Sequence, residues 1–233
     1  MEKYQTSRKT TMIHFSHLKI FGKTHVHLIQ SYGLFLLSLF SMGLGISLVT
    51  LAHLGTTPIT SPPYVLSLYL PISFGMLTML FNFLFVFVEI LLLGKDFPKK
   101  QYLQFIVGPV LGLAIDFWSY LIRFFPQTDY WLQLSMVIVG CVIITHSTIL
   151  QIKAQVINNP AEGIVKAISS KVTKEFGEVK LYFDVGLVVM AVVISILAFG
   201  TVQGIREGTI ISALMIGPLI KICQKQQIMK RNG

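Results

Sequence analysis

Charged residues are scarce in this chain, and their scarcity excludes most classes of soluble protein. Only 12% of the 233 residues are Asp, Glu, Lys or Arg, whereas 53% are hydrophobic. A typical soluble domain has about 25% charged residues. The 65 residues between Lys23 and Glu89 include no charged residue. Because a transmembrane helix needs about 20 mostly apolar residues, the sequence indicates an integral membrane protein rather than a soluble enzyme or a nucleic-acid-binding module.

Cysteines and enzyme motifs are also sparse. Cys141 and Cys223 lie in apolar stretches without the spacing of a metal site or a disulfide framework, so we predict no metal and no cofactor. The sequence has no phosphate-binding glycine loop, no HExxH motif and no nucleophile elbow, so we predict that it is not an enzyme. The N-terminal residues lack the pattern of a cleaved signal peptide. We expect residues 1–31 to form a cytoplasmic tail with a short amphipathic helix around Phe15–Phe21.

Six segments are long and apolar enough to cross a bilayer as helices. Residues 32–223 are therefore expected to form an all-α transmembrane bundle, followed by a cytoplasmic tail over residues 224–233. The sixth segment is short and ends at Lys221, whose side chain could reach the interface by snorkelling. The expected spans are Tyr32–Ala52, Phe74–Leu93, Leu103–Phe124, Trp131–Gln151, Leu181–Phe199 and Gly208–Cys223.

Two connections between these spans differ from ordinary loops. Residues 54–73 carry four prolines yet stay mostly apolar, and residues 152–180 contain an apolar pattern that follows Asn159-Pro160. That pattern predicts a helix that begins at Pro160 with Asn159 as its N-cap. We expect broken or re-entrant segments at both places, because irregular backbone at membrane depth needs protein or a cavity around it. Connections at the membrane interface are the alternative.

Basic residues predict the orientation of the chain. With the N-terminus inside, 17 of the 19 lysines and arginines fall on the inner side, and only Arg123 and Arg206 fall outside. Cytoplasmic loops carry an excess of basic residues, so both termini are expected in the cytoplasm. The net charge of +9 is therefore attributed to cytoplasmic loops beside the lipid bilayer rather than to nucleic-acid binding.

The two halves of the expected bundle, residues 32–124 and 131–223, resemble each other. Matching positions occur in the same order, at an offset of 102 residues up to the middle of the fifth span and at a larger offset beyond it. We therefore expect the fifth span to be longer than the second by about a turn. Three spans in each half would make the second copy cross the membrane in the opposite direction, as in many secondary transporters. The matches are Thr57-Pro58 with Asn159-Pro160, Phe74-Gly75 with Phe176-Gly177, Asn82 with Asp184, and Gly94 with Gly200.

Polar residues inside the expected spans are candidates for binding a solute or a coupling ion. A carboxylate such as Asp116 is costly in lipid and usually faces a bundle interior, a partner or a water-filled path. Snorkelling beside Arg123 is the alternative for Asp116. Asp184 matches the polar Asn82 of the other half, and its alternative is a surface ion pair with Lys180, four residues earlier.

Two further polar features complete the predicted site. His146 is the group in the run Thr145–Thr148 that titrates near neutral pH, and local bonding to the helix backbone is the alternative role of that run. Arg206 precedes the sixth span, where free backbone N–H groups favour an anion, and an interfacial pair with Glu207 is its alternative. The predicted substrate-binding residues are Thr57, Pro58, Asn82, Asp116, His146, Asn159, Asp184 and Arg206.

Three strings carry a resemblance to a known family. They are Gly43-Leu-Gly45 leading to Leu54-Gly-Thr-Thr-Pro58, the Phe74-Gly75 start of the second span, and REGTIISALMIGPLI from Arg206 to Ile220, which is the most specific. Over residues 32–223 the chain resembles the YczE/YitT-like group of bacterial inner-membrane proteins. The resemblance implies a multi-pass protein of the bacterial cytoplasmic membrane, and it transfers no functional residues.

Together these features predict a small-solute transporter, with an anionic solute and proton coupling as the narrower expectation. The rival class is an accessory membrane protein that binds or stabilises another membrane complex without transport. A polar cavity that reaches the midplane would favour transport, whereas a solid bundle with Asp116 and Asp184 both paired would favour the accessory role. The partners left open are a small solute, a second copy of the chain and another membrane protein.

Overall fold

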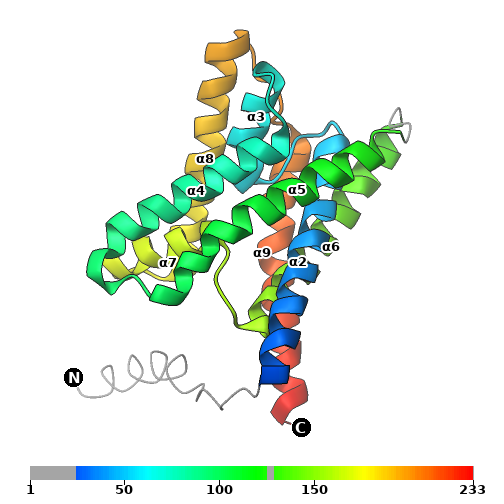
Figure 1. Ribbon diagram of the computed structural model, residues 1–233. Coiled ribbons are helices and arrows are strands. Elements are labelled where there is room, and N and C mark those ends of the chain that lie inside the picture. The colour runs from blue at the N-terminus through cyan, green and yellow to red at the C-terminus, as the bar shows by residue number, and fades with distance from the viewer. Residues whose placement is uncertain (1–24, 125–128, 233) are drawn as a thin grey trace, which may run out of the picture.

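The computed structural model describes residues 25–124 and 129–232, and every regular element in these two ranges is a helix (Figure 1). The expected all-α class is therefore confirmed, while the expected helix around Phe15–Phe21 lies outside the described residues. The long helices are α2 (His25–Leu51), α4 (Phe74–Leu93), α5 (Gln104–Ile122), α6 (Tyr130–Ala154), α8 (Phe176–Phe199) and α9 (Glu207–Asn232). The short ones are η1 (Pro58–Thr60), α3 (Ser61–Tyr69), η2 (Gly94–Asp96), η3 (Lys99–Leu103) and α7 (Pro160–Val172).

Five of the long helices are long and apolar enough to cross a membrane: α2, α4, α5, α6 and α8. They confirm five of the six expected spans. The sixth expected span is helical as part of α9, but α9 does not belong to the five. Large apolar side chains cover the outside of the bundle, and Leu197 on α8 is 82% exposed. Since so large an apolar surface suits hydrocarbon rather than water, the chain is a membrane-type helical protein.

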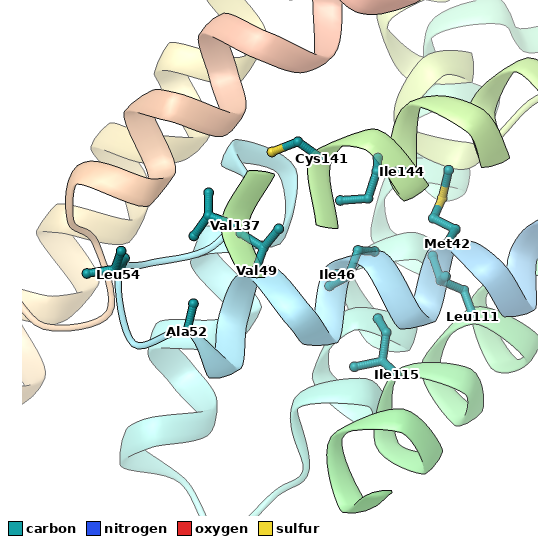
Figure 2. Close-up of a cluster of buried hydrophobic side chains, with 10 residues drawn as sticks. All are labelled: Met42, Ile46, Val49, Ala52, Leu54, Leu111, Ile115, Val137, Cys141 and Ile144. Carbon is teal, nitrogen blue, oxygen red and sulfur yellow. The ribbon is translucent and has the colours of Figure 1, made fainter. Parts of the chain in front are cut away.

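Helix α2 lies at the centre of the main apolar core, between α5 and α6. Figure 2 shows the ten buried side chains that converge there. Glycines bring the helix axes close together, because a Cβ on Gly45 would lie 2.9 Å from the Gly140 carbonyl oxygen of α6, and one on Gly43 would lie 2.7 Å from the Ala114 Cβ of α5. Small residues at such crossings are the usual means of close packing between membrane helices.

The elements of the two halves follow the same order. Helices α4 and α8 both begin at a Phe-Gly pair, at Phe74 and Phe176, and both end before a glycine with positive φ, at Gly94 and Gly200. Helix α8 has 24 residues and α4 has 20, so the expected extra turn of the fifth span is confirmed. The expected helix after Asn159 is also confirmed, because α7 begins at Pro160 and the Asn159 side chain caps it.

Two of the short helices, α3 and α7, lie near opposite ends of α8 (Figure 1). One end, which we call the top, holds α3 and the end of α8. The lower part of the molecule, which we call the base, holds α7 and, further down, the start of α2 and the end of α9. Packing between the halves is crossed, since α3 packs against α8 and α7 packs against α4.

Candidate functional site

A polar cavity of about 230 Å³ opens at the base, where α6 ends and α7 begins. Five amide side chains line it together with one lysine and one glutamate, so the cavity offers both donors and acceptors of hydrogen bonds. We call it the base pocket. Its lining residues include Gln101, Gln151, Gln155, Asn158, Asn159, Glu162 and Lys166.

The non-helical break before α7 forms one wall of the base pocket. The Asn159 side chain accepts a hydrogen bond from the Ala161 backbone N–H at 3.2 Å, which caps the helix. The Asn158 backbone N–H donates to Gln101 Oε1 at 3.2 Å, and Lys166 Nζ donates to Asn158 Oδ1 at 2.6 Å. The break is thus held by side chains from both η3 and α7.

Met42 of α2 connects the base pocket to the apolar core. The side-chain amides of Gln151 and Asn159 both donate toward Met42 Sδ, at 3.6 and 3.7 Å. A thioether is a weak acceptor, so these amides keep hydrogen-bonding capacity for a ligand. Met42 itself belongs to the core cluster around α2.

Glu162 is the acidic residue of the pocket. Burial raises the pKa of its carboxyl above the ordinary value of 4.5, and the positive charges of Lys166 and Lys180 oppose that rise. Lys166 belongs to α7, and Lys180 lies near the start of α8.

A buried carboxyl group lies beside the pocket, at the contact between α4 and α7. Glu89 is 3% exposed, and the fully buried Gln104 of α5 hydrogen-bonds to it. Gln104 Nε2 also donates to Gln101 Oε1 at 2.7 Å. Since Gln101 lines the base pocket, a chain of side chains joins the buried Glu89 to the cavity.

At the top, the break between α2 and η1 is buried against the start of α9. The Gly208 backbone N–H donates to the Leu54 carbonyl at 2.7 Å, and the Thr56 backbone N–H donates to Thr209 Oγ1 at 3.2 Å. Gly55 has a φ of +105°, where glycine is favoured, and a Cβ there would lie 2.9 Å from the Arg206 backbone nitrogen. The top break is therefore closed by direct packing.

Threonine hydroxyls fill the interior of the top break. Thr56 Oγ1 lies 2.8 Å from Thr50 Oγ1 and 2.9 Å from Thr60 Oγ1, and the latter lies 2.7 Å from Thr57 Oγ1. All four side chains are buried. We call Thr50, Thr56, Thr57 and Thr60 the threonine cluster; its hydroxyls bond mainly to one another.

The two predicted carboxylates have partners inside the protein. Asp116 Oδ2 accepts from Ser73 Oγ at 2.6 Å and Asp116 Oδ1 accepts from the Gly75 backbone N–H at 2.8 Å, so this α5 residue caps the start of α4. Asp184 pairs with Lys180 at 2.9 Å within α8. These contacts account for both carboxylates without a ligand, and their predicted substrate roles stay predictions.

The remaining predicted residues do not meet in one place. Thr57 and Pro58 are buried at the top break, where exposed Arg206 donates to the His53 carbonyl at 3.2 Å and pairs with Glu207 at 3.3 Å. His146 is exposed on the outside of α6. Its neighbours Thr145 and Thr148 donate to backbone carbonyls four residues earlier, which is the local bonding given above as the alternative. Asn82 is buried on α4 and Asn159 lies at the base pocket.

The sequence-based prediction missed most of the polar residues near the base. Glu89 carried a usable signal, since a charged residue inside an apolar span usually has a function. Gln101, Gln104 and Gln151 carried none, because uncharged amides are common at helix ends and their convergence depends on helix packing.

The fold and the pocket define a class, a multi-helix membrane protein with a polar cavity beside a broken segment. Residues 29–225 match the family described as "Family of unknown function (DUF6198)", and the chain belongs to this family. No curated protein and no solved structure matches the chain.

Proposed function

We propose that the protein is a small-solute transporter built from two inverted three-span repeats. The main observation that supports this proposal is a difference between the two matching breaks, before η1 and before α7. The break before α7 lines an open polar pocket, whereas the corresponding break before η1 is closed by the start of α9. A carrier that opens one side at a time needs two equivalent segments in different states of closure.

Crossed hydrogen bonds support the repeat. Thr56 and Asn158 correspond at the offset of 102 residues, and each donates its backbone N–H to a side chain of the other half. The acceptors, Thr209 and Gln101, both lie where the third span of a half begins. The crossed packing of α3 on α8 and α7 on α4 follows the same relation.

We propose α9 as the sixth span, because its apolar side chains face outward, with Leu214 70% exposed. Six spans place the start of α2 and the end of α9 on one side, as Figure 1 has them. The basic residues make the base the cytoplasmic side of a bacterial membrane. The strings shared with the YczE/YitT-like group support the same location.

The pocket lining favours a small polar solute that carries both donor and acceptor groups. Amides predominate, and the single charges of Lys166 and Glu162 oppose each other in sign. A purely anionic solute would meet the Glu162 carboxylate as well as the Lys166 ammonium. A zwitterionic or neutral polar solute therefore fits better than the anion expected from the sequence.

Alternating accessibility of the two breaks tests this proposal. We would place single cysteines at Asn159 and at Thr57, in a chain with Cys141 and Cys223 replaced, and label them with a membrane-impermeant maleimide from each side of oriented vesicles. Asn159→Cys should react from the base side, and Thr57→Cys slowly from the opposite side. A cross-link that holds α7 in place and closes the base pocket should increase the rate at which Thr57→Cys is labelled from the opposite side. Lys95→Cys and Gln203→Cys, at the exposed base and top, are the controls for orientation.

Solute identity would follow from a thermal-shift screen with small polar compounds, since a bound solute raises the apparent stability. Each hit would then be tested for counterflow in proteoliposomes. Labelling of both breaks from the same side would contradict the inverted repeat, and hits without counterflow would contradict transport.

An accessory role is the second candidate function. The observation that favours it is the internal pairing of both Asp116 and Asp184, which leaves these carboxylates no need for a solute. Under this alternative, the weakly packed α8 would bind a membrane partner through its apolar face. Solute-dependent flux that Asn159→Ala abolishes would exclude a purely accessory role.

A further inference from the structure

Glu89 and Gln104 present two buried oxygens that have no hydrogen-bond donor. Glu89 Oε2 and Gln104 Oε1 are both fully buried and unpartnered. Both atoms are acceptors when the carboxyl is ionised, so two buried acceptors without a protein donor lie at this contact. Leaving a buried charged acceptor unsatisfied is costly, and a buried carboxylate normally acquires a proton or a cation.

The space between Glu89 and α7 favours a proton over a cation. A Cβ added to Gly163 of α7 would lie 2.8 Å from Glu89 Cδ and 3.0 Å from Gln104 Nε2, so the Gly163 backbone covers the carboxyl directly. Neither a metal ion nor an ammonium group fits between Oε2 and Gly163. A proton needs no additional volume and converts Oε2 from an acceptor into a donor.

The charged groups around Glu89 leave it without an ion pair. Lys166 of α7 is the cation whose field reaches Glu89, but its Nζ lies 2.6 Å from Asn158 Oδ1. On the same helix, Glu162 competes for the charge of Lys166, and Lys180 of α8 pairs with Asp184. From α5 and η3 the nearest groups are the neutral amides of Gln104 and Gln101. No salt bridge within the described ranges involves Glu89.

We propose that Glu89 is a proton-binding site coupled to the base pocket. Its carboxyl holds the proton while α7 covers it, and gives the proton to water when α7 moves away. Ionised Glu89 then faces water and Lys166, and neutral Glu89 lets α7 return. The side chains of Gln104 and Gln101 connect this event to the break at Asn158. The inference rests on the proposed transport function and names the proton as its coupling ion.

Infrared spectroscopy of the whole protein in lipid nanodiscs tests the proton directly. Near neutral pH we expect a protonated-carboxyl C=O component that Glu89→Gln removes and that the control Glu162→Gln retains, whatever Glu162 itself adds to the band. Glutamine keeps the shape and the donor of the neutral acid, so this variant should fold. In Gly163→Ala the new methyl group displaces Glu89, and the same band should disappear at lower pH than in the wild type. A protonated-carboxyl band whose intensity does not change in Glu89→Gln would overturn the proposal.

Cysteine labelling tests the coupling to α7 without any solute. Ala161→Cys is buried in the contact of α7 with α4 and α8, in a chain that lacks both native cysteines. Its maleimide reactivity, divided by that of the same cysteine in the Glu89→Gln background, should rise about tenfold per pH unit while Glu89 loses its proton, because the open population follows the deprotonated fraction. In Glu89→Gln the reactivity should rise only as the thiol itself ionises. A ratio that does not change with pH would overturn the coupling.

The two proposals fail separately. Protonation of Glu89 without counterflow of any solute would leave the proton site and remove transport. Solute counterflow that is unaffected by a pH gradient and by Glu89→Gln would leave transport and remove the coupling.

Discussion

The carboxylate of Asp116, on α5, is stabilised by neutral hydrogen-bond donors of another helix rather than by a cation. Its two oxygens accept from Ser73 and Gly75 at the start of α4, where backbone N–H groups lack helical partners. This contact requires α4 and α5 to lie close together, and they do so because the backbone of Gly75 packs against that of Gly112. A residue with a side chain at position 75 would force the two helices apart.

Gly75→Ala should therefore destabilise the protein by about 1–3 kcal/mol, the usual cost of overpacking. The added Cβ would lie 2.6 Å from Asp116 Cγ and against the Gly112 carbonyl oxygen. The matched control is Gly177→Ala at the same place in α8, where a Cβ meets nothing within 4 Å, so its effect should be near zero. The free energy of unfolding in mixed micelles measures both. Equal losses would contradict the close contact between α4 and α5.

Glu162 should make stability decline with increasing pH. Burial raises its pKa in the folded protein above 4.5, so above that pH the folded chain binds more protons at this residue than the unfolded chain. Stability then falls as the pH rises from the ordinary value through the raised one. Glu162→Gln should remove this decline, and the exposed Glu175→Gln should leave it in place. Melting temperatures between about pH 4 and about pH 8 measure it; an unchanged slope in Glu162→Gln would contradict this assignment.

At the scale of elements, the molecule depends on a few close crossings and two breaks. Helix α2 contacts both α5 and α6, and its glycines allow the approach. The breaks before η1 and α7 differ in what covers them, since protein closes the first and a cavity borders the second.

The crossing of α2 and α6 predicts different effects for two glycines of one helix. A Cβ on Gly45 would lie 2.7 Å from Ile144 Cγ1 and 2.9 Å from the Gly140 carbonyl oxygen, whereas one on Gly33 would meet nothing within 4 Å. Gly45→Ala should cost about 1–3 kcal/mol, and Gly33→Ala should be neutral or slightly stabilising. Thermal unfolding in detergent compares them, and a neutral Gly45→Ala would show that the helices cross elsewhere.

At the scale of the whole molecule, each break binds to the opposite half. The top break contacts the start of α9, and the base break contacts η3, just before α5. This exchange makes the two halves interdependent, so neither is expected to fold stably without the other.

Pairs of cysteines, one in each half, should detect these contacts between a break and the opposite half. Thr56→Cys with Thr209→Cys should form a disulfide on mild oxidation, because Thr209 Oγ1, which a cysteine sulfur would replace, lies 3.2 Å from the Thr56 backbone nitrogen. Gln101→Cys with Asn158→Cys should be joined by a short bifunctional thiol reagent, because their hydrogen bond of 3.2 Å is made by the end of the long Gln101 side chain. Thr57→Cys with Asn159→Cys should not, since these residues belong to breaks at opposite ends. Mobility on non-reducing gels measures the cross-link, and a Thr57–Asn159 disulfide within one chain would contradict the fold.

Much of the fold could be predicted from local patterns. The spans follow from the length of apolar runs, and the start of α7 follows from Asn159-Pro160, since an N-cap and a first-turn proline act within a few residues. The extra turn of α8 follows from the spacing between Phe176-Gly177 and Gly200. Such features need no knowledge of neighbouring helices.

The positions and partners of the polar side chains could not be predicted in this way, because they depend on the packing of neighbouring helices. Asp116 and Asp184 look alike in the sequence, yet one caps another helix and the other pairs within its own. His146 lies in the most polar run of a span and still faces outward, because the helix rotation is set by the packing of α6 on α2 and α9.

The sequence by itself determined that this is a helical membrane-type chain with two proline-marked breaks, because hydropathy and helix caps act over short distances along the chain. Only the tertiary structure decided which break is closed, which one borders a pocket, and that Gly163 of α7 covers the carboxyl of Glu89. These outcomes depend on contacts between residues far apart in the chain, and the geometry of such contacts is fixed only when the helices pack.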